Sequence, residues 1–230
     1  MTPSDLDAHL ESLRRGALAQ GLCLLPQQQA RFRRYFEVLS RWGRALRLTG
    51  LRDPGAWVEA HFLDSLTALP FVEKAHSLLD VGSGAGFPGV PLSICRDALA
   101  VSLMEPHGKK ASFLRMLADE LALPQVQVLQ ARVEDCPKPC FDVVISRATW
   151  SVEEWVPRGA AWLARRDPSR GTLVAMLGKR VPGQGILLRI GEAAGLSLCS
   201  ITHLRLPLSG AQRTLVAWRT TGAEGRQNSS

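Results

Sequence analysis

The stretch Leu79-Asp80-Val81-Gly82-Ser83-Gly84-Ala85-Gly86-Phe87-Pro88-Gly89 decides how this chain folds. The apolar residues up to Val81 predict a strand, the glycines predict a tight loop, and Pro88 suits the first turn of a helix. Glycines in such a loop can adopt positive φ angles and let a ligand approach the backbone. The order of strand, glycine loop and helix predicts a doubly wound α/β sheet that binds its ligand at the carboxyl ends of the strands.

Two cofactors are compatible with this loop. Residues 84–89 match the dinucleotide pattern G-x-G-x-x-G, but such a loop begins at the strand end, and counting from Gly82 puts bulky Phe87 at the third glycine. An acid two residues before the first glycine is instead typical of S-adenosylmethionine sites, and Asp80 lies there. The loop therefore favours S-adenosylmethionine, with an NAD-dependent oxidoreductase as the alternative. The candidate cofactor-binding residues of this stretch are Asp80, Gly82, Ser83, Gly84, Gly86 and Phe87.

Charged residues follow the next predicted strands. Glu105 ends the second strand, 19 residues after Gly86, where a carboxylate can accept both ribose hydroxyls of an adenosine. Val133 and Glu134 follow the third strand and are candidates to hold the adenine. Arg147 ends the fourth strand, at the edge where substrate and cofactor are expected to meet. The alternative for Arg147 is a structural ion pair with an acid such as Glu134.

Strands alternate with helices from residue 77 onward. This alternation and the continuous Val- and Leu-rich strands predict a mostly parallel sheet of seven strands that is covered on both faces. Together with the S-adenosylmethionine-type loop, the expected fold is a Rossmann-like seven-stranded methyltransferase sheet. No helix separates the last two strands, so we expect an antiparallel hairpin at one edge. The expected strands are 78–81, 101–105, 126–129, 141–146, 172–177, 198–206 and 214–218, and the expected helices are 88–96, 109–121, 152–164 and 184–194.

A helical lead precedes the sheet. Residues 4–20, 27–47 and 54–70 read as helices, the last one ending at Pro70. In the second helix one stripe is apolar, which predicts packing against the rest of the protein; its members are Phe32, Tyr35, Phe36, Leu39, Trp42 and Leu46. We therefore divide the chain into a helical extension (1–70), a methyltransferase domain (71–220) and a polar tail (221–230).

The charge is unevenly placed along the chain. The net charge is +7, yet residues 31–52 hold seven Arg against one Glu, and residues 158–230 hold 11 basic against 3 acidic residues. Arginine-rich surfaces suit bidentate recognition of phosphates, so Arg34, Arg41 and Arg44 are candidate RNA-binding residues. The alternative is that these arginines merely form a solvated helix face.

Several features exclude other classes of protein. No apolar run approaches the ~20 residues of a membrane span, and residues 1–12 lack a basic-then-apolar signal sequence. The five cysteines form no zinc-binding set, so we expect reduced thiols and no metal site. The expected protein is cytoplasmic and not bound to a membrane.

Four motifs together resemble the RsmG family, also called glucose-inhibited division protein B. They are residues 80–91 (DVGSGAGFPGVP), 145–148 (ISRA), 48–49 (LT) and 61–66 (HFLDSL), and the resemblance covers roughly residues 30–218. Members of this family use S-adenosylmethionine to methylate N7 of a guanine in small-subunit (16S) ribosomal RNA. The resemblance implies cofactor contacts at Gly82, Phe87, Val133, Glu134 and Arg147, with Arg147 also facing the guanine as the catalytic residue.

The same resemblance sets expectations about chemistry and partners. Guanine N7 has a free lone pair and no proton, so we expect positioning and no general base; His61 is then a packing histidine. Family members carry a lysine before the glycine that follows the fifth strand, but here Leu177 precedes Gly178, so Lys179 or Arg180 would have to contact RNA instead. The partner would be 16S rRNA in the small subunit or in an assembly intermediate. We expect the protein itself to be a monomer. A non-catalytic RNA-binding scaffold is a further alternative.

Overall fold

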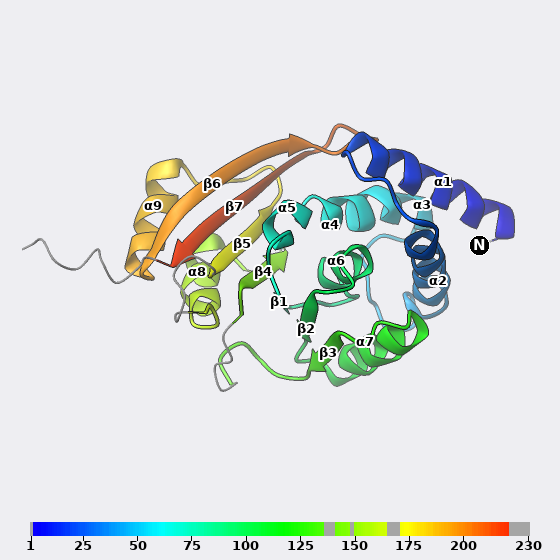
Figure 1. Ribbon diagram of the computed structural model, residues 1–230, viewed down its shortest axis with the longest axis horizontal. Helices are drawn as coiled ribbons and strands as arrows, with labels where there is room; N and C mark the ends of the chain where they lie inside the picture. Colours follow the sequence, from blue (N-terminus) through cyan, green and yellow to red (C-terminus); the bar gives the residue numbers. More distant parts are fainter. Residues whose placement is uncertain (1, 136–140, 148–149, 165–170, 221–230) are drawn as a thin grey trace, which may run out of the picture.

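A computed structural model describes residues 2–135, 141–147, 150–164 and 171–220. In these parts of the chain, seven strands form one sheet in the order β3-β2-β1-β4-β5-β7-β6 (Figure 1). The pairings of β7 with β5 and with β6 are antiparallel, and the remaining pairings are parallel. The strands are β1 (Ser77–Val81), β2 (Ala100–Met104), β3 (Val126–Leu129), β4 (Val143–Arg147), β5 (Thr172–Leu177), β6 (Leu196–Arg205) and β7 (Gln212–Thr220).

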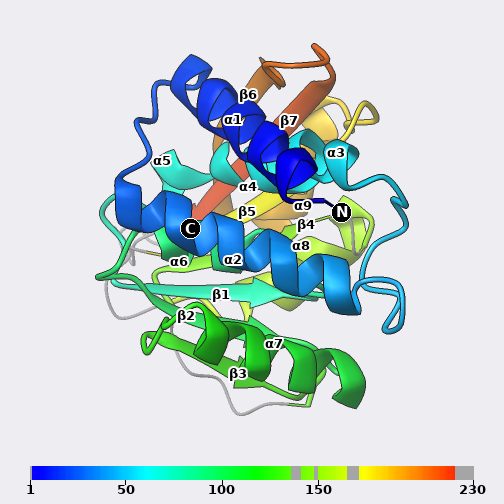
Figure 2. The ribbon, with the colours of Figure 1, turned by 90° about the vertical axis from the view of Figure 1, so that its right-hand side faces the viewer.

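Both faces of the sheet are covered, because neighbouring residues of each strand point to opposite faces. Leu78 belongs to one core and Leu79 to the other. The first core contains side chains of the helices from α1 to α7, and α1 and α2 lie in front of α6 and the sheet in Figure 2. The second core contains side chains of α8 and α9. The helices of the domain are α6 (Gly89–Cys95), α7 (Gly108–Glu120), α8 (Val152–Ala160) and α9 (Gln184–Ala193).

The predicted sheet is confirmed, with its antiparallel edge. Strands β3 and β5 have the predicted bounds, and the other strand and helix bounds differ by a few residues. Among the elements that follow the helical extension, the largest difference is at α8, which ends at Ala160 and not at residue 164. Phe141, expected in the fourth strand, forms an isolated bridge with Leu163.

The helical extension is shorter and more broken than predicted. It consists of α1 (Pro3–Ala19), α2 (Pro26–Trp42), α3 (Pro54–Trp57), the π-helix η1 (Val58–Leu63), α4 (Asp64–Leu66) and α5 (Leu69–Val72). The helix expected to end at Pro70 therefore ends at Leu66, and Pro70 lies in the first turn of α5. Helix α2 stops at Trp42, so the apolar stripe is buried through Leu39, while Trp42 is 39% exposed.

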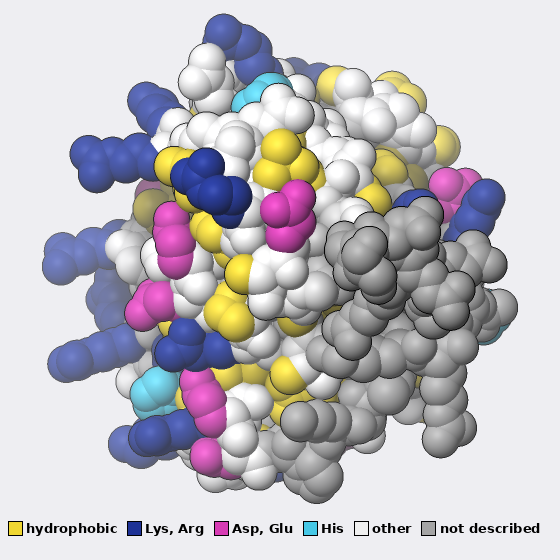
Figure 3. Space-filling model, turned by 90° about the vertical axis from the view of Figure 1, so that its left-hand side faces the viewer, with side chains coloured by type: hydrophobic (Ala, Val, Ile, Leu, Met, Phe, Trp, Pro, Cys, Tyr) yellow, Lys and Arg dark blue, Asp and Glu magenta, His cyan; other side chains and the backbone are white. Residues whose placement is uncertain are grey.

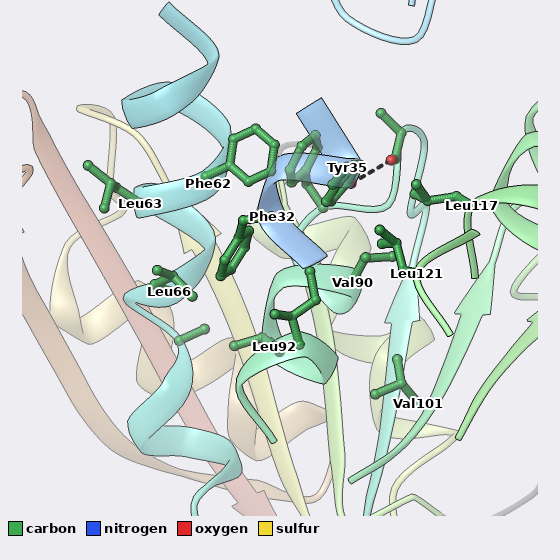
Figure 4. Close-up of a cluster of buried hydrophobic side chains, with 14 of the residues drawn as sticks. Phe32, Tyr35, Phe62, Leu63, Leu66, Val90, Leu92, Val101, Leu117 and Leu121 are labelled. Carbon is green, nitrogen blue, oxygen red and sulfur yellow. Dashed lines mark hydrogen bonds between the residues drawn. The ribbon is translucent and has the colours of Figure 1, made fainter. Parts of the chain in front are cut away.

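The extension and the sheet share one core. Phe32, Tyr35 and Phe62 of the extension pack with Val90, Leu92 and Val101 of the domain, as Figure 4 shows. The division of the chain at residue 70 stays a prediction, and the polar tail lies outside the described residues. Across the residues that the structure describes, no helix is long and apolar enough to cross a membrane.

Candidate functional site

The glycine loop after β1 is fixed from two sides. The backbone N–H groups of Gly82 and Ser83 donate to the carbonyl of Met104 at 2.9 and 3.1 Å, which ties the loop to the end of β2. On the other side, the Tyr35 hydroxyl of α2 donates to the carbonyl of Ala85 at 2.7 Å (Figure 4). Gly86 has a φ of 106°, and a Cβ there would lie 2.7 Å from the Tyr35 hydroxyl oxygen. Only glycine therefore fits where the helical extension meets the loop.

Asp80, near the end of β1, holds the residue that follows the loop. Its carboxylate is fully buried and accepts a hydrogen bond from Gly89 N–H at 2.9 Å. Burial raises the pKa of Asp80 to about 6, against the opposing effect of that hydrogen bond. We predicted Asp80 as a cofactor-binding residue, but its side chain does not line the neighbouring cavity. Its observed contact joins the start of α6 to the end of β1.

Glu105 is held at the mouth of the loop. Its Oε2 accepts a hydrogen bond from Gly84 N–H at 3.0 Å, and its Oε1 accepts one from His107 N–H at 3.0 Å. The His107 ring nitrogen Nδ1 lies 2.7 Å from the same Oε1. The side chain is almost completely buried, so these contacts fix its orientation. The carboxylate can still accept further hydrogen bonds, because each oxygen has two lone pairs.

A cavity of about 340 Å³ opens beside Gly84 and Glu105. This volume lies at the lower end of the range of small-molecule sites. Five of the predicted cofactor-binding residues line it: Gly82, Gly84, Glu105, Val133 and Glu134. The lining also includes Met104, Lys110, Arg132 and Trp150, which the sequence analysis did not single out. Ser83, Gly86, Phe87 and Arg147 do not line it.

Arg147 belongs to a second group beside the loop. Its Nη1 donates to Asp64 Oδ2 at 3.1 Å and to the carbonyl of Ala60 at 2.9 Å. Asp64 is buried and also accepts a hydrogen bond from Arg213 Nε at 2.9 Å. The alternative of a structural ion pair for Arg147 is therefore realised, but with Asp64 as the acid, while Glu134 pairs with Arg158 at 2.9 Å. One carboxylate thus orients two guanidinium groups, from β4 and from β7.

His61 lies against Arg147 and the loop. Its ring stacks on Phe87 with centroids 4.9 Å apart, and Arg147 Nη2 lies 3.4 Å from its Nδ1. Its Nε2 lies 2.7 Å from the Thr49 hydroxyl. Burial and then the charge of Arg147 lower the pKa of His61 to about 4, so the ring is neutral at physiological pH. His61 packs as predicted, but it does so from a π-helix, which the sequence did not predict.

The lowered pKa of His61 predicts a dependence of stability on pH. The histidine of an unfolded chain titrates near pH 6.5. Between pH 6.5 and 4, His61 is therefore protonated in the unfolded chain but still neutral in the folded protein. The free energy of unfolding should decrease as the pH falls from 6.5 to 4. Asp80 contributes with the opposite sign, so the test compares wild type with His61→Gln by urea unfolding at several pH values. The stability difference between the two proteins should shift in favour of His61→Gln as the pH falls. A difference that is constant from pH 7 to 4.5 would contradict the shift.

The candidate RNA-binding residues lie in different parts of the structure and differ in their contacts. Arg34 is in ion pairs with Glu37 at 2.9 Å and with Glu120 at 2.6 Å, so its charge is compensated. Arg41 and Arg44 are exposed near the end of α2. Lys179 and Arg180 are exposed after β5, where Lys179 lines a hollow of about 460 Å³ together with Arg205 and Arg213.

Three residues of the site, Tyr35, Asp64 and Trp150, were not predicted as functional residues from the sequence. Asp64 and His61 both belong to the stretch 61–66 that carried part of the family resemblance, which was the available signal. In the sequence, Tyr35 looks like any other member of the apolar stripe. Only its hydrogen bond to the Ala85 carbonyl shows that it holds the glycine loop.

Comparison with solved structures identifies the fold as that of the S-adenosylmethionine-dependent methyltransferases. Magnesium protoporphyrin IX methyltransferase from Synechocystis PCC 6803, solved with bound S-adenosylmethionine, matches with a TM-score of 0.60 at 13% identity, over 86% of this chain and 98% of the other. A SAM dependent methyltransferase from Aquifex aeolicus matches with a TM-score of 0.54 at 18% identity, over 76% and 97% of the two chains.

The family follows from sequence similarity. The family model described as rRNA small subunit methyltransferase G matches residues 28–184. A ribosomal RNA small subunit methyltransferase G from Anaeromyxobacter sp. (strain Fw109-5) is 40% identical over 212 residues, which are 90% of this chain and 96% of the relative. One from Neisseria gonorrhoeae is 36% identical over 90% and 96% of the two chains. The chain belongs to the rRNA small subunit methyltransferase G family, which confirms the predicted resemblance and disfavours the oxidoreductase.

Proposed function

We propose that this protein transfers the methyl group of S-adenosylmethionine to N7 of a guanine in 16S ribosomal RNA. The observation that carries the proposal is the cavity beside Gly84 and Glu105 in a chain of this family. We further propose that it acts as a cytoplasmic monomer on the small subunit or on an assembly intermediate.

The residues around the cavity fit an adenosine-containing cofactor. The buried Glu105 carboxylate faces the cavity from the end of β2 and has remaining capacity to accept ribose hydroxyls. Val133 and Trp150 supply apolar surface for a flat ring, and Lys110 and Arg132 add basic side chains to the lining. In this proposal Gly82 and Gly84 contact the cofactor through their backbone, while Asp80, Ser83 and Gly86 hold the loop that presents it.

The second group of residues supports the transfer step. When bound, S-adenosylmethionine supplies a methyl group on a positively charged sulfur. Guanine N7 offers a lone pair and loses no proton, so no residue here has to act as a base. The neutral His61 and the buried Phe87 ring pack beside the oriented Arg147 guanidinium, which lies 5.3 Å from the centre of that ring, and in this proposal Arg147 positions the base. Arg147 is proposed as the catalytic residue in this positioning sense.

The proposal is tested by incubating the protein with radiolabelled S-adenosylmethionine and unmethylated small ribosomal subunits, then mapping the labelled base. Label at N7 of one guanine of 16S rRNA is the expected result. A reaction with excess unlabelled S-adenosylhomocysteine serves as the control for site-specific transfer. Label on another atom, or no label with active cofactor binding, would contradict the proposal. The second result would favour the non-catalytic scaffold.

A further inference from the structure

We propose that residues 41–52, which we name the arginine tip, dock the RNA strand next to the target base. In this inference the arginines bind phosphates and Trp42 stacks on an unpaired base. It rests on the proposed function, because it names the surface by which that RNA is held. The tip consists of the end of α2 and the turns that follow, and it contains Arg41, Trp42, Arg44, Arg47 and Arg52.

The arginines in the first half of α2 form ion pairs with carboxylates of the same protein. Arg31 pairs with Asp97 at 2.6 Å, Arg33 with Asp7 at 2.5 Å, and Arg34 with Glu37 and Glu120. The pairs with Asp97, Asp7 and Glu120 join α2 to other parts of the fold. The positive charge of this half of the helix is therefore largely balanced by nearby carboxylates.

The arginines of the tip differ in this respect. All four are exposed, and the segment 41–52 contains no Asp or Glu. Among the described residues, no carboxylate lies within ion-pair distance of Arg41, Arg44, Arg47 or Arg52. Unbalanced guanidinium groups close together attract phosphates and release counterions when they bind them. The charge that remains available on this helix is thus concentrated at its end.

Trp42 adds an aromatic surface to this charge. It continues the apolar stripe of α2 in sequence, yet it is 39% exposed, whereas Phe32, Tyr35, Phe36 and Leu39 are buried. No aromatic ring contacts it in the part of the chain that the structure describes. An exposed ring between arginines is the arrangement by which proteins stack on unpaired bases while holding the backbone.

The tip also lies beside the proposed transfer site. Thr49 within it contacts His61 at 2.7 Å, and His61 stacks on Phe87 next to Arg147. In Figure 2, α2 ends at the right-hand edge, toward which β1 points. That edge becomes the left-hand margin in Figure 3, which views the molecule from the opposite side, and Lys and Arg side chains gather along it. RNA docked on the tip would therefore reach the carboxyl ends of the strands.

The test compares two pairs of substitutions on one helix. Arg41→Gln/Arg44→Gln removes two charges from the tip, and Arg31→Gln/Arg33→Gln removes two charges that are balanced by carboxylates. Binding to unmethylated small subunits and to protein-free 16S rRNA is measured by filter retention at several salt concentrations. The tip pair should reduce the log–log salt slope by about 1.5, since each phosphate contact contributes about 0.7–0.9. The control pair should change it much less.

Trp42 is tested separately. Trp42→Ala should weaken RNA binding roughly tenfold, and Trp42→Phe, which keeps a stacking ring, should restore most of the affinity. Affinity for S-adenosylhomocysteine, measured by calorimetry, should stay unchanged in all of these variants and shows that they are folded.

Three outcomes would overturn the inference. One is an equal change of slope in the two arginine pairs, and another is equal binding by Trp42→Ala and Trp42→Phe. The third is an effect seen with subunits but not with protein-free rRNA, which would mean that the tip meets an acidic protein surface. Failure of the wild-type protein to methylate any rRNA would instead contradict the proposed function, so the two failures are distinguishable.

Discussion

Arg147→Ala should lower the turnover of methyl transfer by about 100-fold or more. The guanidinium is fixed by Asp64 and the Ala60 carbonyl and lies over Phe87, so its loss removes the group that is best placed to orient the base. Misplacement of a reactant by about 1 Å can cost a factor of that size. Turnover is measured with saturating S-adenosylmethionine and small ribosomal subunits. Because Asp64 keeps its partner Arg213, the variant should still fold.

The pH dependence of this variant separates positioning from proton transfer. The profile of turnover between pH 6 and 9 should keep its shape while its height falls, because N7 has no proton to lose. Arg147→Lys is the matched control, since it keeps the charge but loses the planar fork, and it should recover only part of the rate. An ionisation that appears or vanishes in Arg147→Ala would contradict a purely positioning role.

Glu105→Ala should weaken binding of S-adenosylmethionine about tenfold to a hundredfold. Loss of a hydrogen bond to a charged group costs about 1.5–3 kcal/mol, and each 1.4 kcal/mol is a factor of ten in affinity. The variant also releases Gly84 N–H and His107 N–H, which the carboxylate holds in place. Isothermal titration calorimetry with S-adenosylmethionine or S-adenosylhomocysteine measures the effect.

Two further variants make this test specific. Glu105→Gln keeps an acceptor for Gly84 N–H but not the charge, so its loss of affinity should be smaller. Gly84→Val places a β-branched residue at a φ of 57° and should also impair binding, because such residues rarely adopt positive φ. Unchanged affinity in both Glu105→Ala and Gly84→Val would exclude the proposed cofactor site.

Local sequence patterns were sufficient for the sheet and for most of the cofactor site. The strand ending at Val81, the glycines after it and Glu105 at the end of the next strand are set by residues close together in the chain. In a parallel sheet the carboxyl ends of neighbouring strands meet at one edge, so their order along the chain already brings Gly84 and Glu105 together. The period of the apolar residues likewise predicted that Phe32, Tyr35 and Leu39 are buried.

The sequence by itself thus determined the class of fold, the family and the edge of the sheet, at the carboxyl ends of the strands, where the cofactor is proposed to bind. Only the tertiary structure decided which charges are available and which side chains surround Arg147. Arg34 and Arg41 look alike in sequence, yet Arg34 meets Glu120, a residue 86 positions away. Asp64 meets Arg147 across 83 positions through a π-helix that local propensity does not predict. Charges separated by such distances along the chain interact only after folding brings them within a few ångströms, because the attraction between exposed charges in water is screened beyond about 10 Å.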